Sequence, residues 1–298
     1  MFDTIHFFCP RRLPHQPLPP GWSLKAFADT AWGASQAETR HTHRYLHVGT
    51  GLTAAGAGEE IKHVKCSLPH VLFGTNGKLI KNAAELHEAE RRVDDILDEI
   101  SVLQTGSHYY TRVDLVWQFL GDAELFKIAH RQARHTRIRK DAGQYDGESM
   151  YWRGSNLKIR IYDKGKELKL KRRDAVRVEV ELHGRLLKEL LGDGSHLRTL
   201  DFDRAYQAYR EIMLGFCPAD VPRVSDLVEL LATGEAFDWS ANGVSVFELW
   251  KHGKNPEHIH RVQKHIAALR PRFFNLDWAK LLPADGPPEP VEIASTNL

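Results

Sequence analysis

The stretch that decides the fold is residues 149–183, SMYWRGSNLKIRIYDKGKELKLKRRDAVRVEVELH. It holds two runs in which apolar and polar residues alternate, at 158–164 and 176–183, joined by a turn-rich and highly charged connector. Alternation with a period of two is typical of a β-strand with one buried and one solvated face. We therefore expect two strands whose apolar side chains face a core and whose charged side chains form a polar face directed outward.

That polar face would bring together a tyrosine, several cations and several carboxylates. Tyr162 and Lys164 belong to the polar set of the first run, and Glu179 belongs to that of the second. A phenol beside a lysine, near acids able to hold a metal, is suited to phosphodiester transesterification. An ordinary exposed sheet face has the same pattern, so the choice depends on the rest of the chain.

Length and charge limit the function classes. The 298 residues, 42% of them hydrophobic, suit one large or two small domains with a sizeable core. A formal net charge of +2 gives no global signature of a nucleic-acid binder. Two segments, 130–140 and 164–173, are rich in Lys and Arg, and each is either a solvated face or a contact for a polyanion such as DNA.

The cysteine spacing and the lengths of the apolar runs indicate the cell compartment in which the protein works. The 3 cysteines lie at neither metal-binding nor CxxC spacing, which argues against a secreted disulfide framework. The apolar run at the N-terminus is too short for a signal peptide. No stretch approaches the roughly 20 apolar residues of a membrane span. We expect a soluble cytoplasmic protein with no membrane partner.

The order of expected elements defines a fold class. Strands are predicted at 2–9, at 110–119, and within 61–73, where Pro69 ends the strand. Amphipathic helices are predicted at 81–103 and 122–135, before the two strands of the opening stretch. This order predicts an α+β fold, a central and mainly antiparallel sheet with helices on one face.

The composition changes after Gly192. We expect residues 1–192 to form this α+β domain and residues 193–282 to form a helical C-terminal domain. The two helices expected within 244–270 have conceivable helix–turn–helix spacing, although ordinary helix pairs are common. Residues 283–298 contain four prolines and few apolar residues, which predicts a disordered tail.

Three blocks, in this order, resemble a known family. They are KHVKCSLPHVLFGTNG at 62–77, TRVDLVWQF at 111–119, and IRIYDKGKEL followed by VRVEVEL within 159–182. The chain is similar to the replication-initiator endonucleases of filamentous phages, the gene II protein family, and more loosely to rolling-circle initiators of some plasmids. The likeness extends over roughly residues 60–192.

The resemblance implies an activity and its setting. A family member recognises a double-stranded phage origin, nicks one strand through a tyrosine that becomes joined to the 5′ phosphate, and later rejoins the displaced single strand. It implies DNA as substrate, Mg²⁺ or Mn²⁺ as cofactor, the replication helicase and polymerase of a bacterial host as partners, and the host cytoplasm as location. The family nucleophile falls on Tyr162 and the family acids fall on Asp114 and Glu179. His63, where phage relatives can hold a glutamate, is the third candidate metal ligand.

Chemistry supports these assignments. A phosphodiester repels nucleophiles, so it needs a positioned nucleophile, a cation on its oxygens and an acid for the leaving group. Lys164, two residues beyond Tyr162, would share its strand face and act as phosphate clamp or phenolate stabiliser, or would be a surface lysine. Asp114 and Glu179 could reach one ion if their strands are neighbours, with Glu181 in reserve.

Several cationic and aromatic residues are further candidates for contacts to DNA. Candidate contacts to DNA phosphates are Arg153, Lys158, Arg160, Arg134 and Arg137. Tyr151 and Trp152 could stack an unpaired base or pack in the core, and His41 and His43 could be a metal motif or part of a loop or strand edge. Two other functions remain open: a non-catalytic DNA-binding replication regulator, and a metal-dependent hydrolytic nuclease in which Tyr162 is structural.

Overall fold

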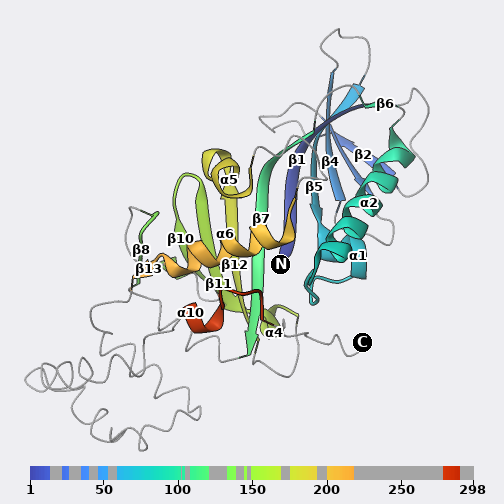
Figure 1. Ribbon diagram of the computed structural model, residues 1–298. Helices are drawn as coiled ribbons and strands as arrows, with labels where there is room; N and C mark the ends of the chain where they lie inside the picture. Colours follow the sequence, from blue (N-terminus) through green and yellow to red (C-terminus); the bar gives the residue numbers. More distant parts are fainter. Residues whose placement is uncertain are drawn as a thin grey trace, which may run out of the picture.

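A computed structural model describes most of the residues between 1 and 217 and a short segment near the C-terminus. The described ranges are 1–13, 22–26, 35–39, 46–52, 59–101, 103–104, 108–120, 133–138, 144–145, 149–168, 175–192, 200–217 and 278–288. In these ranges the chain forms one large sheet, a small second sheet, and helices packed on one side of the large sheet (Figure 1).

The large sheet has 11 strands. Its order is β2 (Trp22–Ala26), β3 (Ser35–Thr39), β4 (Leu46–Leu52), β5 (Glu59–Ser67), β1 (Phe2–Arg12), β7 (Tyr109–Leu120), β12 (Ala175–His183), β11 (Leu157–Asp163), β10 (Ser149–Arg153) and β9 (Gln144–Tyr145). The short β6 (Leu103–Gln104) pairs with β1, and β8 (Arg134–His135) pairs with β13 (Phe216–Cys217) in the small sheet. The described pairings are antiparallel.

The two strands expected from the opening stretch are neighbours. β11 and β12 pair so that Arg160 lies opposite Glu179. β12 then pairs with β7, which places Glu181 opposite Asp114. The adjacency on which the site hypothesis depends is thus confirmed, although a strand pairing of this kind is not visible in any local pattern.

The structure differs from the predictions in two elements. β5 ends at Ser67, just before Pro69, where the sequence predicts the end of the strand. The residues that follow, Leu68–Phe73, form the helix α1 with Pro69 in its first turn, and this helix was not predicted. Pro lacks the N–H that a strand needs but fits the first turn of a helix. Most of the helix expected at 122–135 lies outside the described residues, and its last two residues form β8 instead.

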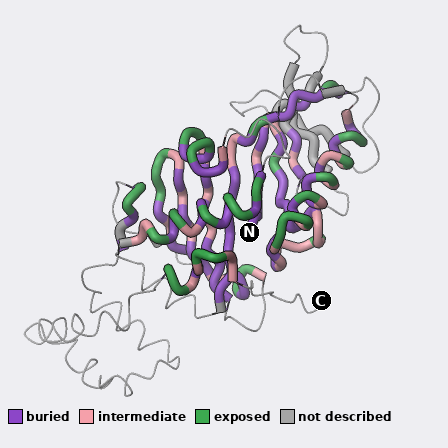
Figure 2. The backbone as a smooth tube through the Cα atoms, viewed as in Figure 1, coloured by how far each residue is buried: buried purple, intermediate pink, exposed green. Residues whose placement is uncertain are grey.

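The helices pack on one face of the sheet. They are α1, α2 (Ala83–Ile100), α5 (Gly184–Leu191), α6 (Phe202–Leu214) and α10 (Trp278–Leu281), with the short α4 (Lys164–Glu167) following β11. In Figure 1, α2 and α6 lie on the viewer's side of the strands. Figure 2 shows their outer surfaces exposed, whereas the sheet beneath is largely buried. The expected α+β class, with helices on one face of an antiparallel sheet, is confirmed.

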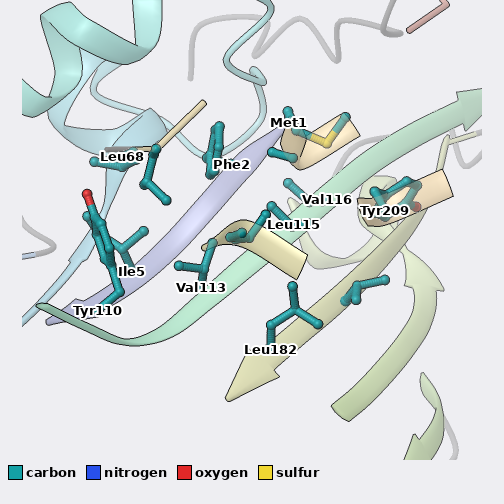
Figure 3. Packing of buried hydrophobic residues seen from close by; sticks show 14 of the residues in the cluster. Met1, Phe2, Ile5, Leu68, Tyr110, Val113, Leu115, Val116, Leu182 and Tyr209 are labelled. Atoms are coloured by element: carbon teal, nitrogen blue, oxygen red, sulfur yellow. The ribbon is translucent and has the colours of Figure 1, made fainter. Parts of the chain in front are cut away.

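The core lies between that sheet face and the helices. Fully buried side chains from both layers lie there (Figure 3). They include Phe2 and Ile5 of β1, Leu115 of β7, Leu182 of β12 and Tyr209 of α6, each 0% exposed. These side chains come from strands whose apolar positions alternate, so the other face of β7, β12 and β11 carries their polar positions.

The helices after residue 192 belong to the same core. Tyr209 donates a hydrogen bond of 3.1 Å to the backbone carbonyl of Val178 in β12. Trp278 packs edge-on against Phe119 of β7, with ring centroids 5.6 Å apart. The expected boundary between residues 192 and 193 therefore does not divide this core. The start of the expected tail is also bound, because the carbonyl of Pro283 accepts a hydrogen bond of 2.6 Å from Tyr206.

In the part of the chain that the structure describes, no helix is long and apolar enough to cross a bilayer.

Candidate active site

The sheet face opposite the helices is lined by polar side chains from three neighbouring strands. They are Arg112, Asp114 and Gln118 from β7, Arg177, Glu179, Glu181 and His183 from β12, and Lys158, Arg160 and Tyr162 from β11. Cross-strand partners share a face, so the register alone brings these residues together. The predicted polar face therefore exists, and the tyrosine lies beside a carboxylate on it.

Tyr162 and Glu179 make the central contact. The phenol donates a hydrogen bond of 2.5 Å to Oε1 of Glu179. The guanidinium of Arg160 lies 4.2 Å from the centroid of the Tyr162 ring, and its Nη1 is 3.8 Å from Oε2 of Glu179. Burial, and then the charge of Glu179, raise the pKa of Tyr162 well above its ordinary value. The phenol is thus neutral and has a carboxylate as its proton acceptor.

Tyr162 does not face outward as expected, since it is only 3% exposed. Opposite it lies the fully buried Arg177, which donates to Oε1 of Gln118 at 2.9 Å and to the carbonyl of Asn76, and pairs with Asp3 at 3.4 Å. The bond to Asn76 holds the segment between α1 and α2 at this end of the sheet, and the side-chain amide of Gln118 also donates to the carbonyl of Gly77 in that segment, at 3.2 Å. The prediction that Arg177 and Tyr162 point to solvent is wrong for this reason.

Lys164 lies near Tyr162, but it belongs to the helix α4 and not to the predicted strand. The strand ends at Asp163, whose carboxylate accepts a hydrogen bond of 2.8 Å from the backbone N–H of Lys166 and so caps α4. Lys164 is therefore helical and does not share the strand face of Tyr162. Its fully buried Nζ donates to Glu167 at 2.8 Å and lies 5.8 Å from the centroid of the Tyr162 ring. Burial, and then Arg177, lower the pKa of Lys164.

Asp114 and Glu181 share one guanidinium. Nε and Nη2 of Arg112 donate to the two carboxylate oxygens of Asp114, at 2.7 and 2.6 Å. Nη2 also pairs with Oε2 of Glu181 at 2.7 Å. Burial raises the pKa of Asp114 to about 7 in spite of Arg112. Burial acts in the same direction on Glu181, but its hydrogen bond with His183 and the charge of Arg112 lower the pKa of that carboxyl to about 2.

The three predicted metal ligands are not brought together. Asp114 is bound by Arg112 and Glu179 by Tyr162, whereas His63 lies on β5 opposite Phe8 and packs edge-on against that ring at 5.5 Å. Among the residues that the structure describes, no three His, Cys, Asp or Glu side chains are arranged to hold a metal ion. His41 and His43 lie outside those residues. The described residues therefore do not fit a metal, and Mg²⁺ or Mn²⁺ stays a prediction.

The predicted DNA contacts fall in two places. Three cations surround the ring of Tyr151 on β10, on the face of Tyr162: Arg153, Lys158 and Arg160, at 4.9, 5.6 and 5.6 Å from its centroid. Arg137 instead pairs with Glu189 of α5 and Glu211 of α6, on the helical side. Arg134 belongs to β8, and its side chain lies outside the described part.

Two residues of the site were missed by sequence reasoning. Arg177 reads as one more outward cation of an alternating strand, and Asp3 lies 174 positions from it in the chain. An arginine in a Val-rich strand is the one local signal, because an uncompensated buried charge is costly and implies a partner. No pattern indicates that this partner is in β1.

Comparisons with known proteins are sparse. No family model matches the chain. A search of curated proteins gives no match. Among solved structures, the chain is similar to a rolling circle replication initiator protein from Geobacillus stearothermophilus, with a TM-score of 0.35 and 11% identity over 61% of this chain and 73% of that one.

Proposed function

We propose that this protein starts rolling-circle replication by nicking one strand of a double-stranded phage origin through Tyr162 and later rejoining the displaced strand. The observation that carries the proposal is the hydrogen bond of 2.5 Å from the Tyr162 phenol to Glu179, on a sheet face that also carries Arg160. A nucleophile, a base and a cation for the phosphate thus lie side by side. The host helicase and polymerase would extend the 3′ end that nicking releases.

Glu179 acts as the base. Burial, and then Asp3, raise the pKa of its carboxyl, which makes it a stronger acceptor for the phenolic proton. As the proton moves to Glu179, the phenolate oxygen forms a bond to phosphorus and the bond from phosphorus to O3′ breaks. The proton then passes to O3′, so the products are a 5′-phosphotyrosyl ester and a free 3′ hydroxyl. Rejoining is the reverse of this exchange, and the ester conserves the bond that hydrolysis would lose.

Arg160 has two positions in this scheme. In the structure its guanidinium covers the Tyr162 ring at 4.2 Å. Because Tyr162 is buried, the scheme requires this side chain to swing away so that a phosphate can reach the hydroxyl. The same movement brings a planar cation to the non-bridging oxygens, where it offsets the charge that develops in the transition state.

Denaturing gels of the protein incubated with supercoiled origin DNA test the proposal. We expect a covalent protein–DNA species with the wild-type chain and none with Tyr162→Phe. Tyr206→Phe is the matched control, because Tyr206 is a buried tyrosine on the helical side, bonded to Pro283. It should form the adduct normally. Nicking that persists in Tyr162→Phe would contradict the proposal.

The same assay separates the other two functions. Cleavage without any covalent species would identify a hydrolytic nuclease. Origin binding without cleavage, with Mg²⁺ or Mn²⁺ present and after chelation, would identify a replication regulator. Loss of the adduct on chelation, restored by either ion, would support the predicted cofactor.

A further inference from the structure

We infer that the sheet face of Tyr162 continues into a base-stacking platform for single-stranded DNA, made by Tyr109, Phe8 and His63. The inference rests on the proposed function and says where a strand held at Tyr162 runs. The three residues come from β7, β1 and β5, which are neighbours in the sheet, and Phe8 lies opposite both Tyr109 and His63.

The platform is an aromatic stack in which Tyr109 is exposed and Phe8 and His63 are partly buried. Tyr109 is 46% exposed, and Leu214 is the other large apolar side chain that stands out to solvent in the described part of the chain. The Tyr109 ring lies nearly parallel to that of Phe8, with centroids 5.0 Å apart and an interplanar angle of 25°. His63 packs edge-on against the same Phe8 ring. Flat aromatic faces on a sheet are the groups on which unpaired bases stack.

A break in strand register puts Tyr109 on this face. β1 and β7 pair in step from Ile5 to His6 and then slip, so that Phe7 lies opposite Tyr110 and Phe8 opposite Tyr109. Tyr110 turns into the core, where it is 7% exposed and donates a hydrogen bond of 3.3 Å to Glu90. The slip therefore turns its neighbour outward, onto the polar side.

The register also joins the platform to the site. His6 lies opposite Arg112 of β7 and Lys65 of β5, and Arg112 lies opposite His183 of β12. These residues connect Phe8, two positions after His6, with the face that carries Glu179. From strand spacings, Tyr109 lies on the order of 30 Å from Tyr162. Single-stranded sites of about 4–16 nucleotides per domain cover such a distance.

Charge favours a nucleic acid as the occupant. Lys65 is exposed beside the platform, and Arg112, Lys158 and Arg160 follow on the way to Tyr162. Cations beside a phosphate backbone with aromatic rings beneath the bases are the two components of single-strand binding. In a duplex the base faces are already stacked on one another, so they cannot stack on an exposed aromatic ring of the protein. The combination therefore favours the displaced or unwound strand.

Fluorescence anisotropy with a labelled single strand of about 20 nucleotides tests the inference, in a Tyr162→Phe background that cannot form the ester. We expect Tyr109→Ala to weaken binding by about 5- to 150-fold, the contribution of one stacked base. Tyr109→Phe keeps the ring and should bind as the parent does. Leu214→Ala is the matched control, because Leu214 is a comparably exposed apolar residue on α6, on the helical side.

The outcomes are separable from those of the nicking assay. An unchanged affinity in Tyr109→Ala overturns the platform, even if Tyr162→Phe still abolishes the covalent adduct. A loss in Tyr109→Ala for the 20-nucleotide strand, with none for a strand of about 4 nucleotides, supports it whether or not nicking is detected. A loss of the same size in Leu214→Ala would mean a non-specific effect and would also overturn it.

Discussion

Glu179 lies between the phenol of Tyr162, at 2.5 Å, and the guanidinium of Arg160, at 3.8 Å. In the proposed reaction, this position would give the phenolic proton of a buried tyrosine an acceptor, and the cation above the ring would move to the phosphate. The carboxylates further along the face serve another purpose. Asp114 and Glu181 hold Arg112, which leaves neither of them in contact with Tyr162.

Replacing Glu179 by Gln keeps the shape of the side chain and removes the proton acceptor. We expect Glu179→Gln to slow formation of the covalent adduct by about 10²- to 10⁴-fold, the usual contribution of a general base. Single-strand binding should stay unchanged. Single-turnover gels and anisotropy on the same preparation measure the two effects, and an equal loss in both would indicate misfolding instead of lost catalysis.

Asp114 gives the fold a specific dependence on pH. Its pKa of about 7 in the folded state lies above the value of roughly 3.9 expected when unfolded. The folded chain thus binds the extra proton, and stability falls as pH rises from about 4 to 7. Asp114→Asn cannot lose a proton, so its Tm relative to wild type should be higher at pH 8 than at pH 5. A difference that does not change with pH would contradict this.

Glu181 should behave in the opposite way. Its pKa of about 2 is depressed, so its contribution is present above about pH 4.5 and is lost as pH falls toward 2. Glu181→Gln serves as the control for Asp114→Asn: its Tm should lie below that of wild type by a similar amount at pH 5 and at pH 8.

At the scale of elements, caps and strand ends determine where side chains of the site lie. The cap at Asp163 turns the chain into α4 and takes Lys164 off the strand. The cap at Asn82 starts α2, since its Oδ1 accepts from the backbone N–H of Glu85 at 2.9 Å while Glu85 accepts from the N–H of Lys81 at 2.8 Å. The first bond satisfies one of the free N–H groups of the helix start, and the second holds the residue that precedes the cap.

Asn82→Ala removes the first of those bonds. We expect the free energy of unfolding to fall by about 1 kcal/mol, the usual cost of losing such a cap. Denaturant titration measures the change. Asn82→Asp keeps an acceptor at the cap and should be close to wild type, whereas an equal loss in both variants would mean that the hydrogen bond is not the cause.

At the level of the whole chain, segments far apart in the sequence pack together in a single core. Trp278 of α10 lies against Phe119 of β7 and near Phe216, although about 60 residues separate it from the described part that ends at Cys217. α6 adds a buried hydrogen bond from Tyr209 to β12. The face opposite these helices carries the polar residues, so helix packing on one side determines which side is available for the proposed contact with DNA.

Trp278→Ala tests whether this late segment is part of the core. Truncating a well-packed Trp costs about 3–5 kcal/mol, so we expect a clear drop in Tm and in the denaturation midpoint. Asp285→Ala alters an exposed residue just beyond the same helix and should have little effect. Equal stability of Trp278→Ala and wild type would show that α10 does not contribute to the core.

The local elements follow from patterns within short stretches of sequence. Alternation over 158–164 and 176–183 predicts β11 and β12 to within a residue at each end, and helical periodicity with a cap at Asn82 predicts α2, because both patterns repeat within a few residues. The sequence also predicted that the tyrosine and the carboxylates share a sheet face. Tertiary packing alone buries Tyr162 beneath Arg160 and pairs Arg177 with Asp3. It also separates His63 from Asp114 and, through a register slip, exposes Tyr109. Each of these depends on which strands pair and in what register, and that is fixed by packing between residues far apart in the chain.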